Sequence, residues 1–314
     1  MLSASVVVTC ADTSPPLAEC LAGLVNQEPR PAEVIVVHRR GGAEIVGLRA
    51  EFPDVRFVEF EGKTDAARNA GLARAGAEVV AFIDSDCVAQ PGWLASLLEN
   101  YRNPAVAAVG GRLVEPSGGT NTLIGLALPN GTLATGFDRD PGRTIQVEHL
   151  SPANASFRRE SLDAAGGFGS HYAGDGGTGV TELCLRLHAG GQRICFAPGA
   201  VVRKPAADRV PPFWPDLRAD YRVRRDHVLL LALVHGTSAK VVRNYLTVAV
   251  REEFDCFARM RARSGPVMAD GTPRLLSRRL TAPVVVGRGL AGVTGLVAGL
   301  AVAVKANAGR KRGG

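Results

Sequence analysis

Two carboxylates at the end of an apolar run are the residues of this sequence best placed to do chemistry. Residues 79–83 are apolar and are followed by Asp84, Ser85 and Asp86, and five apolar residues in succession predict a buried strand. In an extended chain, side chains spaced i, i+2 share one face, so the two carboxylates repel one another unless a cation lies between them. Mg2+ and Mn2+ prefer such oxygen ligands and commonly bind substrate phosphates at the same time. We therefore interpret the pair as a site for a metal-bound diphosphate, with a solvated acidic strand end as the alternative.

Strands and helices alternate over the first hundred residues and would position this pair. Apolar, β-branched runs predict strands, and apolar residues at helical spacing predict helices. The predicted strands are 5–9, 33–37, 55–60 and 79–83, and the predicted helices are 17–24, 64–75 and 94–101. This alternation predicts an α/β fold, with a mostly parallel sheet and helices on both faces. Ligands of such open sheets bind at the carboxyl ends of the strands, where the acidic pair lies.

The next part of the chain is less regular. Residues 106–111 predict one more strand and residues 193–197 a late one, with a short helix at 182–189 before it. Residues 115–145 are rich in Gly, Thr, Pro and Asn and have weak periodicity. We expect a long loop region there, with one short helix, over the site.

The composition changes beyond Pro205. Prolines mark a linker, and a helix with a basic face formed by Arg218, Arg222 and Arg225 follows it. We therefore predict two domains, 1–205 with the sheet and its acidic pair, and 206–314 as a basic, mainly helical extension.

The net charge of +7 hides an uneven distribution. Residues 1–199 carry 16 Lys and Arg against 22 Asp and Glu, a net charge of −6, whereas residues 200–314 carry 21 against 8, a net charge of +13. A basic segment indicates an anionic partner; because aromatic residues are sparse there and no nucleic-acid motif occurs, we expect a membrane surface and no nucleic acid. Residues 282–304 are mostly apolar with small side chains and precede a basic tail. This pattern predicts a helix lying in the membrane interface rather than across it, with a helix packed on the protein as the alternative.

The six cysteines are scattered, with no Cys-x-x-Cys pair. This spacing argues against a zinc site or a disulfide framework and suits a reducing compartment. The N-terminus lacks a basic segment followed by an apolar core, so we expect no signal peptide. We predict a cytoplasmic protein that is peripheral on the inner face of the cell membrane.

Several blocks, in their order and spacing, resemble glycosyltransferases of family 2, whose GT-A fold is built on a Rossmann-like sheet. The resemblance covers roughly residues 5–204 and is carried by blocks at 33–37, 67–71 (Ala-Arg-Asn-Ala-Gly), 81–86 (Ala-Phe-Ile-Asp-Ser-Asp), 154–160, 166–168 and 182–187. It implies inverting transfer of a sugar from a nucleotide-diphosphate donor to a hydroxyl of a sugar, lipid-linked or small-molecule acceptor, as in polysaccharide or cell-envelope biosynthesis. The leaving diphosphate then needs its charge neutralised, and the acceptor hydroxyl needs a base.

The resemblance also implies roles for individual residues. Asp84 and Asp86 would hold a divalent metal, Mn2+ or Mg2+. The nucleotide-sugar would contact Thr9, Ala11, Asp12, His38, Arg68, Asp84, Ser85 and Lys204. The acceptor would lie near Trp93, Asn154 and Arg158; the alternatives are a core aromatic for the first and a polar turn for the other two.

Four positions depart from the family's pattern. Residues 9–12 (Thr-Cys-Ala-Asp) replace a turn that usually holds an aromatic residue, and His38 stands where an Asp usually reads the nucleobase, so the donor need not be a uridine nucleotide. Gly179 and Val180 stand where a Glu-Asp pair usually supplies the base. Lys204 takes the place of a His that often helps to bind metal.

These departures leave two interpretations open. In the first the site is remodelled: Asp175, in a glycine-rich run, acts as the base, and Lys204 pairs directly with a phosphate as a point charge. In the second the chain is a non-catalytic nucleotide-sugar-binding or scaffold protein on the same fold. We favour the first, because Asp84, Asp86 and Arg68 are intact.

Overall fold

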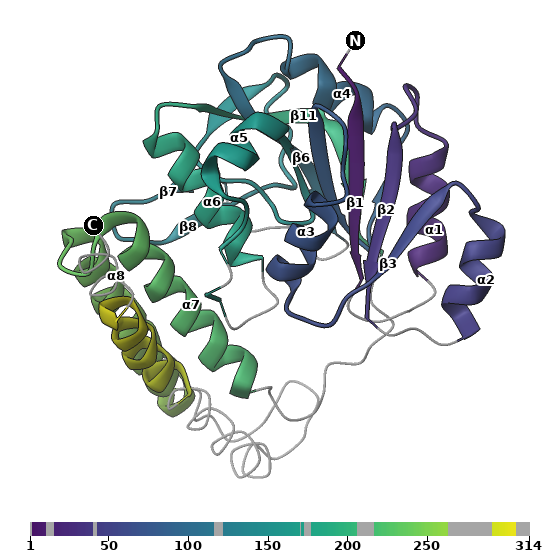
Figure 1. Ribbon diagram of the computed structural model, residues 1–314. Helices are drawn as coiled ribbons and strands as arrows, with labels where there is room; N and C mark the ends of the chain where they lie inside the picture. Colours follow the sequence, from purple (N-terminus) through teal and green to yellow (C-terminus); the bar gives the residue numbers. More distant parts are fainter. Residues whose placement is uncertain are drawn as a thin grey trace. The chain divides into compact units, whose positions relative to one another are not determined.

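The computed structural model describes residues 2–10, 16–39, 43–115, 122–169, 171–172, 177–205, 217–262 and 291–305. The chain divides into two compact units, and Figure 1 labels most of their helices and strands. The first unit comprises residues 1–127 and 133–207, and the second comprises residues 128–132 and 208–314.

The first unit is built on a nine-stranded sheet in the order β3-β2-β1-β4-β10-β6-β11-β5, with β9 paired to β11. Its strands are β1 Ala4–Cys10, β2 Glu33–His38, β3 Val55–Glu59, β4 Val79–Asp84, β5 Val88–Ala89, β6 Val106–Val114, β9 Ile145–Val147, β10 Asn154–Arg158 and β11 Arg193–Arg203. The strands β3, β2, β1 and β4 pair in parallel, and so do β6 and β11. Between these two parallel groups β10 runs antiparallel to both β4 and β6.

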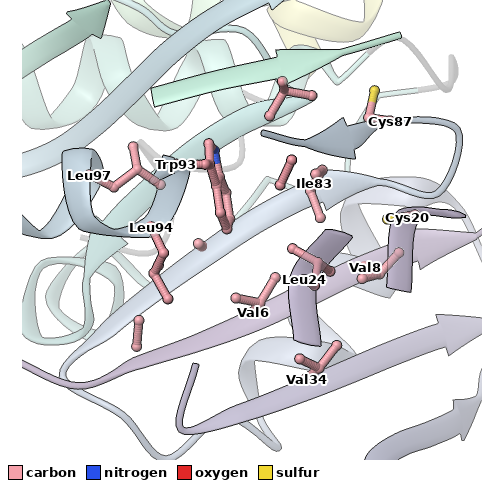
Figure 2. Close-up of a cluster of buried hydrophobic side chains, with 14 of the residues drawn as sticks. Val6, Val8, Cys20, Leu24, Val34, Ile83, Cys87, Trp93, Leu94 and Leu97 are labelled. Carbon is pink, nitrogen blue, oxygen red and sulfur yellow. The ribbon is translucent and has the colours of Figure 1, made fainter. Parts of the chain in front are cut away.

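Helices cover both faces of this sheet, as the sequence predicts. They are α1 Pro16–Val25, α2 Ala43–Glu51, α3 Thr64–Leu72, α4 Trp93–Asn100, α5 Arg159–Ala165 and α6 Thr178–Ala189. One core joins α1, α2 and α4 to the sheet, and Figure 2 shows part of it, with Leu24 and Trp93 from α1 and α4 beside Val6 of β1. The other core places α3, α5 and α6 against the alternate strand residues, such as Val7 and Phe82. Alternation of side chains along each buried strand therefore supplies both layers.

The prediction of a loop region with one short helix at 115–145 is wrong over the described residues 122–145. Residues 122–145 contain no helix; instead β7 Ile124–Ala127 pairs antiparallel with β8 Leu133–Thr135. The turn between them uses Gly131 at φ 83°, and the Asn130 side chain accepts hydrogen bonds from the Thr132 backbone and hydroxyl. Strands of three or four residues separated by such a turn give too short a pattern to recognise.

Two helices have different limits from those predicted. The helix α6 begins at Thr178, not at residue 182, because Gly177 adopts the left-handed conformation (φ 69°) that starts it. The helix α3 ends at Leu72 rather than at residue 75. Ends are the least certain part of a sequence-based assignment.

The Ala-Arg-Asn-Ala-Gly block lies in α3, and each of its polar or small residues has a separate packing role. Gly71 lies so close to β1 that a Cβ there would be 2.4 Å from Cγ1 of Val7. The Asn69 amide donates to the Phe168 carbonyl and accepts from the Phe168 N–H, both at 2.9 Å. The block is therefore tied to the sheet and to residues 166–168, while Arg68 remains for the site.

The second unit is helical in its described part. It contains α7 Leu217–His235, α8 Lys240–Ala262 and a helix at residues 291–305. A Cβ at Gly295 would lie 2.4 Å from the Tyr221 carbonyl oxygen, and one at Gly299 would lie 2.4 Å from that of Arg225. Two glycines one turn apart thus let the last helix pack closely on α7.

The outer face of the helix at 291–305 is apolar. Val293, Val297 and Val304 are 41%, 65% and 52% exposed, whereas Leu296 and Ala303 are buried. The predicted interfacial segment 282–304 therefore has one packed and one exposed face over its described residues. No described helix combines the length and the apolarity that crossing a membrane requires.

Candidate functional site

The carboxyl ends of β1, β2 and β4 converge on one pocket. Parallel pairing sets Thr9 beside Asp84 and Cys10 beside His38, so the residues that end these strands share one edge of the sheet. The pocket has a volume of about 180 Å³ and opens to solvent. It brings together six of the predicted residues: Thr9, His38, Asp84, Ser85, Asp86 and Lys204.

Asp84 is held by two donors. Its Oδ1 accepts from the Thr9 hydroxyl at 3.4 Å and lies 3.4 Å from Nη2 of Arg68. The Arg68 side chain is only 1% exposed, and its Nη1 pairs with Oδ1 of Asp65 at 2.8 Å. A buried guanidinium between two carboxylates keeps its charge compensated. Arg68 contacts Asp84 but is not itself among the residues that line the pocket.

Asp65 continues this chain of contacts to α6. Its Oδ2 accepts from the Gly179 N–H at 3.1 Å, in the first turn of α6, where a helix favours a carboxylate. A Cβ at Gly179 would lie 2.5 Å from the Asp65 carboxylate. The carboxylate of Asp65 therefore fills the space that a side chain at position 179 would need. Sequence reasoning missed this residue, although its i, i+3 spacing from Arg68 on a helix is a signal for an ion pair.

Asp86 has a cation of its own. Its Oδ2 lies 3.0 Å from Nζ of Lys204, and the weak thiol donor of Cys87 lies 3.5 Å from its Oδ1. Burial by itself would lower the pKa of Lys204, but the bond to Asp86 and the charges of Asp86 and Asp84 raise the pKa above its ordinary value. The ammonium is therefore charged at neutral pH.

Three cysteines around the pocket are packing residues. Cys10, Cys20 and Cys87 are buried. Burial, reinforced by Asp84 and Asp86, raises the pKa of the Cys20 and Cys87 thiols well above the usual range. Protonated thiols are poor nucleophiles and poor metal ligands.

His38 is buried where β2 meets the pocket. It is 2% exposed, and its Nδ1–H donates to the Arg39 carbonyl at 2.6 Å, so in the neutral ring Nε2 is an acceptor. That Nε2 is buried without a hydrogen-bond partner among the described residues. Leaving a buried acceptor without a partner costs free energy. Nε2 of His38 is therefore a candidate to accept a hydrogen bond from a ligand.

The acidic pair fits a divalent cation that shares its coordination with a phosphate. Asp84 and Asp86 have side chains 31% and 45% exposed, and each has one oxygen that pairs with no cation of the described residues. Mg2+ commonly binds one or two carboxylates together with substrate phosphates. The described residues contain no group of three or more His, Cys, Asp or Glu that could hold a metal by themselves.

The three predicted acceptor residues do not reach this pocket. Trp93 and Asn154 are fully buried, and the indole N–H donates to the Asn154 amide oxygen at 2.9 Å. The same amide donates to the Arg112 and Ala200 carbonyls, so it joins β10 to β6 and β11. Trp93 is therefore a core aromatic residue, which was the alternative interpretation. Asn154 lies in a buried strand and forms neither an acceptor contact at this pocket nor the polar turn that was its alternative.

Arg158 lies at the other end of the strands, away from the pocket. It is in register with Val79, the first residue of β4, whereas Asp84 is the last. Its guanidinium donates to the Tyr101 and Val106 carbonyls. This position does not support a contact with an acceptor at the pocket. Three other predicted residues, Ala11, Asp12 and Asp175, lie outside the described part of the chain.

Parts of this chain are similar in sequence to known proteins. Pre-mycofactocin glycosyltransferase of Mycobacterium tuberculosis is 34% identical over 139 residues, which are 44% of this chain and 29% of that protein. Succinoglycan biosynthesis protein ExoM of Rhizobium meliloti is 28% identical over 249 residues, which are 72% of this chain and 75% of that protein. The chain thus spans less than a third of the mycobacterial relative.

The fold recurs among solved structures. The crystal structure of GalNAc-T7 with UDP, GalNAc and Mn2+ matches with a TM-score of 0.60 at 11% identity, over 90% of this chain and 54% of that one. At such identity the match shows the fold alone, which is the GT-A fold. The family model for Glycosyl transferase family 2 matches residues 5–166, just over half of the chain. The chain therefore belongs to glycosyl transferase family 2.

Proposed function

We propose that this chain transfers a sugar from a nucleoside-diphosphate donor to an acceptor hydroxyl. The observation that carries the proposal is the pocket at the carboxyl ends of β1, β2 and β4, where Asp84 and Asp86 lie beside the cations of Arg68 and Lys204. In the reaction the bond between the anomeric carbon and a diphosphate oxygen breaks, and the oxygen leaves with the electron pair. The acceptor oxygen forms the new bond and loses its proton to a base.

The residues of the pocket divide this work. Asp84 and Asp86 would hold Mn2+ or Mg2+, which neutralises charge on the leaving diphosphate. Thr9, Ser85, Ala11 and Asp12 belong to the strand ends and loop that would contact the nucleotide, and Nε2 of His38 would accept from a nucleobase N–H. Asp175 remains our prediction for the base, because neither Gly179 nor Val180 can accept a proton.

A diphosphate site also accounts for the two cations, Arg68 and Lys204, that pair with Asp84 and Asp86. Diphosphate groups bind where fixed positive charge and metal lie together, and Arg68 is held in place from below by Asp65. Since the relatives include a succinoglycan biosynthesis protein, we propose an acceptor from polysaccharide or cell-envelope biosynthesis, either a sugar or a lipid-linked sugar.

We further propose that the second unit binds an anionic membrane surface, on the inner face of the cell membrane. The helix at 291–305 exposes Val293, Val297 and Val304, and residues 208–314 carry 19 Lys and Arg against 8 Asp and Glu, a net charge of +11. Apolar insertion and attraction to anionic lipid are each weak and add together.

Thermal unfolding with a panel of nucleoside diphosphates, each with and without Mn2+, tests the donor site. A ligand at a hundred times its Kd stabilises a protein by about 2.7 kcal/mol, so at least one nucleotide should raise the Tm, and more so with Mn2+. Asp84→Asn and Asp86→Asn should remove the gain from Mn2+, whereas Asp163→Asn, on an exposed face of α5, should retain it. Equal Mn2+-dependent shifts in all four proteins would refute the assignment. The non-catalytic alternative predicts the same binding without turnover.

A further inference from the structure

The position of Lys204 follows from the pairing of backbone strands. Lys204 comes directly after β11, and its N–H donates to the Val114 carbonyl at 3.0 Å. The antiparallel pairing of β11 with β5 sets Arg203 beside Val88, two residues after Asp86. The register therefore fixes the Lys204 backbone next to Asp86, and the 3.0 Å contact between Nζ and Oδ2 follows from it.

The pair is accessible as well as formed. The side chains of Lys204 and Asp86 are 34% and 45% exposed, and both line the pocket. An ammonium on four methylenes can turn to a new partner without moving the backbone. By contrast Arg68 is 1% exposed and fixed by Asp65, so of the two cations that pair with Asp84 and Asp86, Lys204 is the one that is able to move.

A divalent cation and this ammonium compete for the same carboxylate. A metal that uses Asp86 would lie within a few ångströms of Nζ, and like charges at that distance repel strongly. A diphosphate changes the balance, because its oxygens accept from the ammonium and neutralise both cations. Metal alone should therefore bind poorly, and metal with a diphosphate should bind well.

We propose that Lys204 occupies Asp86 in the free protein and moves to the donor diphosphate when the metal-bound donor enters. The inference rests on the proposed function, since it assigns an order to the binding of metal and donor at the same site. It makes Lys204 a positioning and selection residue: it holds the metal site closed to free cations and adds positive charge to the diphosphate once the donor is bound. Metal and donor affinities are then coupled, and the coupling is reciprocal.

The Lys204→Gln variant has a signature that a merely structural role would not produce. With the ammonium gone, Asp86 is free, so Mn2+ alone should bind about tenfold more tightly. The nucleoside diphosphate loses a charged contact, so with saturating Mn2+ it should bind about tenfold more weakly. The two affinities change in opposite directions. Lys204→Arg retains the charge and should stay close to wild type in the first measurement.

The experiment measures free Mn2+ by electron paramagnetic resonance during titration of the full chain, first alone and then with UDP or GDP. Lys240→Gln is the control, because it removes one Lys charge from α8, outside the pocket. Tighter binding of Mn2+ alone together with weaker binding of the nucleotide supports the exchange. Unchanged or weaker binding of Mn2+ alone overturns it.

Failure of the proposed function gives a different pattern. If the wild-type protein binds none of the nucleoside diphosphates of the thermal-unfolding panel, with or without Mn2+, the donor site itself is wrong, and the movement of Lys204 to a diphosphate falls with it. If nucleotide binds normally but the Lys204→Gln variant shows no gain for Mn2+ alone, only the exchange is overturned.

Discussion

Replacing Asp65 by Asn tests whether a buried ion pair supports the pocket. The change keeps the shape of the side chain and removes its charge, and the amide oxygen can still accept from the Gly179 N–H. Among the described residues Arg68, at 1% exposure, then keeps Asp84 as its ionic partner, at 3.4 Å. The positive charge remains buried and is only partly compensated.

The expected loss follows from this geometry. Breaking a buried pair from one side typically costs about 3–5 kcal/mol. The lower end applies here, because Asp84 still pairs with Arg68, so we expect about 3 kcal/mol. For a unit of this size that loss lowers the Tm by about 6–12 °C.

Urea unfolding followed by Trp93 fluorescence measures the loss in the first unit. The chain has two Trp residues, so a Trp214→Phe background leaves Trp93, which is fully buried, as the reporter. The matched control is Asp163→Asn, whose 58% exposed carboxylate pairs with Arg159 and should cost at most about 1 kcal/mol. If Asp65→Asn costs no more than this control, the charge of Asp65 does not hold Arg68 in place.

Four further results are expected. Gly71→Ala should cost about 1–3 kcal/mol in the same urea assay, since its methyl would lie 2.4 Å from a β1 side-chain carbon, while Gly47→Ala, with open space around it, should be neutral or stabilising; equal effects would contradict the packing role. Burial raises the pKa of the Cys184 thiol from 9.0 to about 12, so between these pH values the unfolded chain loses a proton that the folded protein retains. The unfolding free energy should therefore fall by about 1.4 kcal/mol per pH unit in this range. Cys184→Ala should make this fall less steep, and an unchanged slope would refute the assignment. Asp175→Asn should lower turnover by about 10²–10⁴-fold with donor binding unchanged, and normal turnover would exclude it as the base. Vesicles with anionic lipid should sediment the full chain in a salt-sensitive way and a chain ending near Ser277 more weakly; equal, salt-resistant binding to neutral vesicles, or no binding, would contradict the peripheral mode.

Local signals made most of the sheet predictable. Runs such as 33–37 and 79–83 are apolar and β-branched, and each became a strand because burial on both faces requires that composition. The Asp-x-Asp spacing then placed the carboxylates at a strand end, and parallel pairing brought them beside Thr9 and His38. The strands and the acidic pair are recognisable from neighbours within a few residues along the chain, and the general rule for parallel sheets supplies the convergence of their ends.

The features that were missed depend on partners far away in the sequence. Asn154 and Trp93 lie 61 residues apart, and a polar residue in a block shared with a family suggested a ligand contact rather than a buried hydrogen bond. Asp65 and Gly179 are 114 residues apart, so no local pattern reveals that one fills the space beside the other. The short strands β7 and β8 are recognisable only from their pairing.

The most direct test of sugar transfer is to incubate the protein and Mn2+ with each of a panel of nucleotide-sugars. Chromatography then measures the nucleoside diphosphate that is released. Wild-type protein should release the diphosphate from at least one donor, faster when an acceptor sugar is added, and Asp86→Asn should abolish the release while the protein remains folded. Binding of nucleotide-sugars by the wild-type protein with no release from any of them, with or without acceptor, would contradict catalysis and leave a binding protein on the same fold.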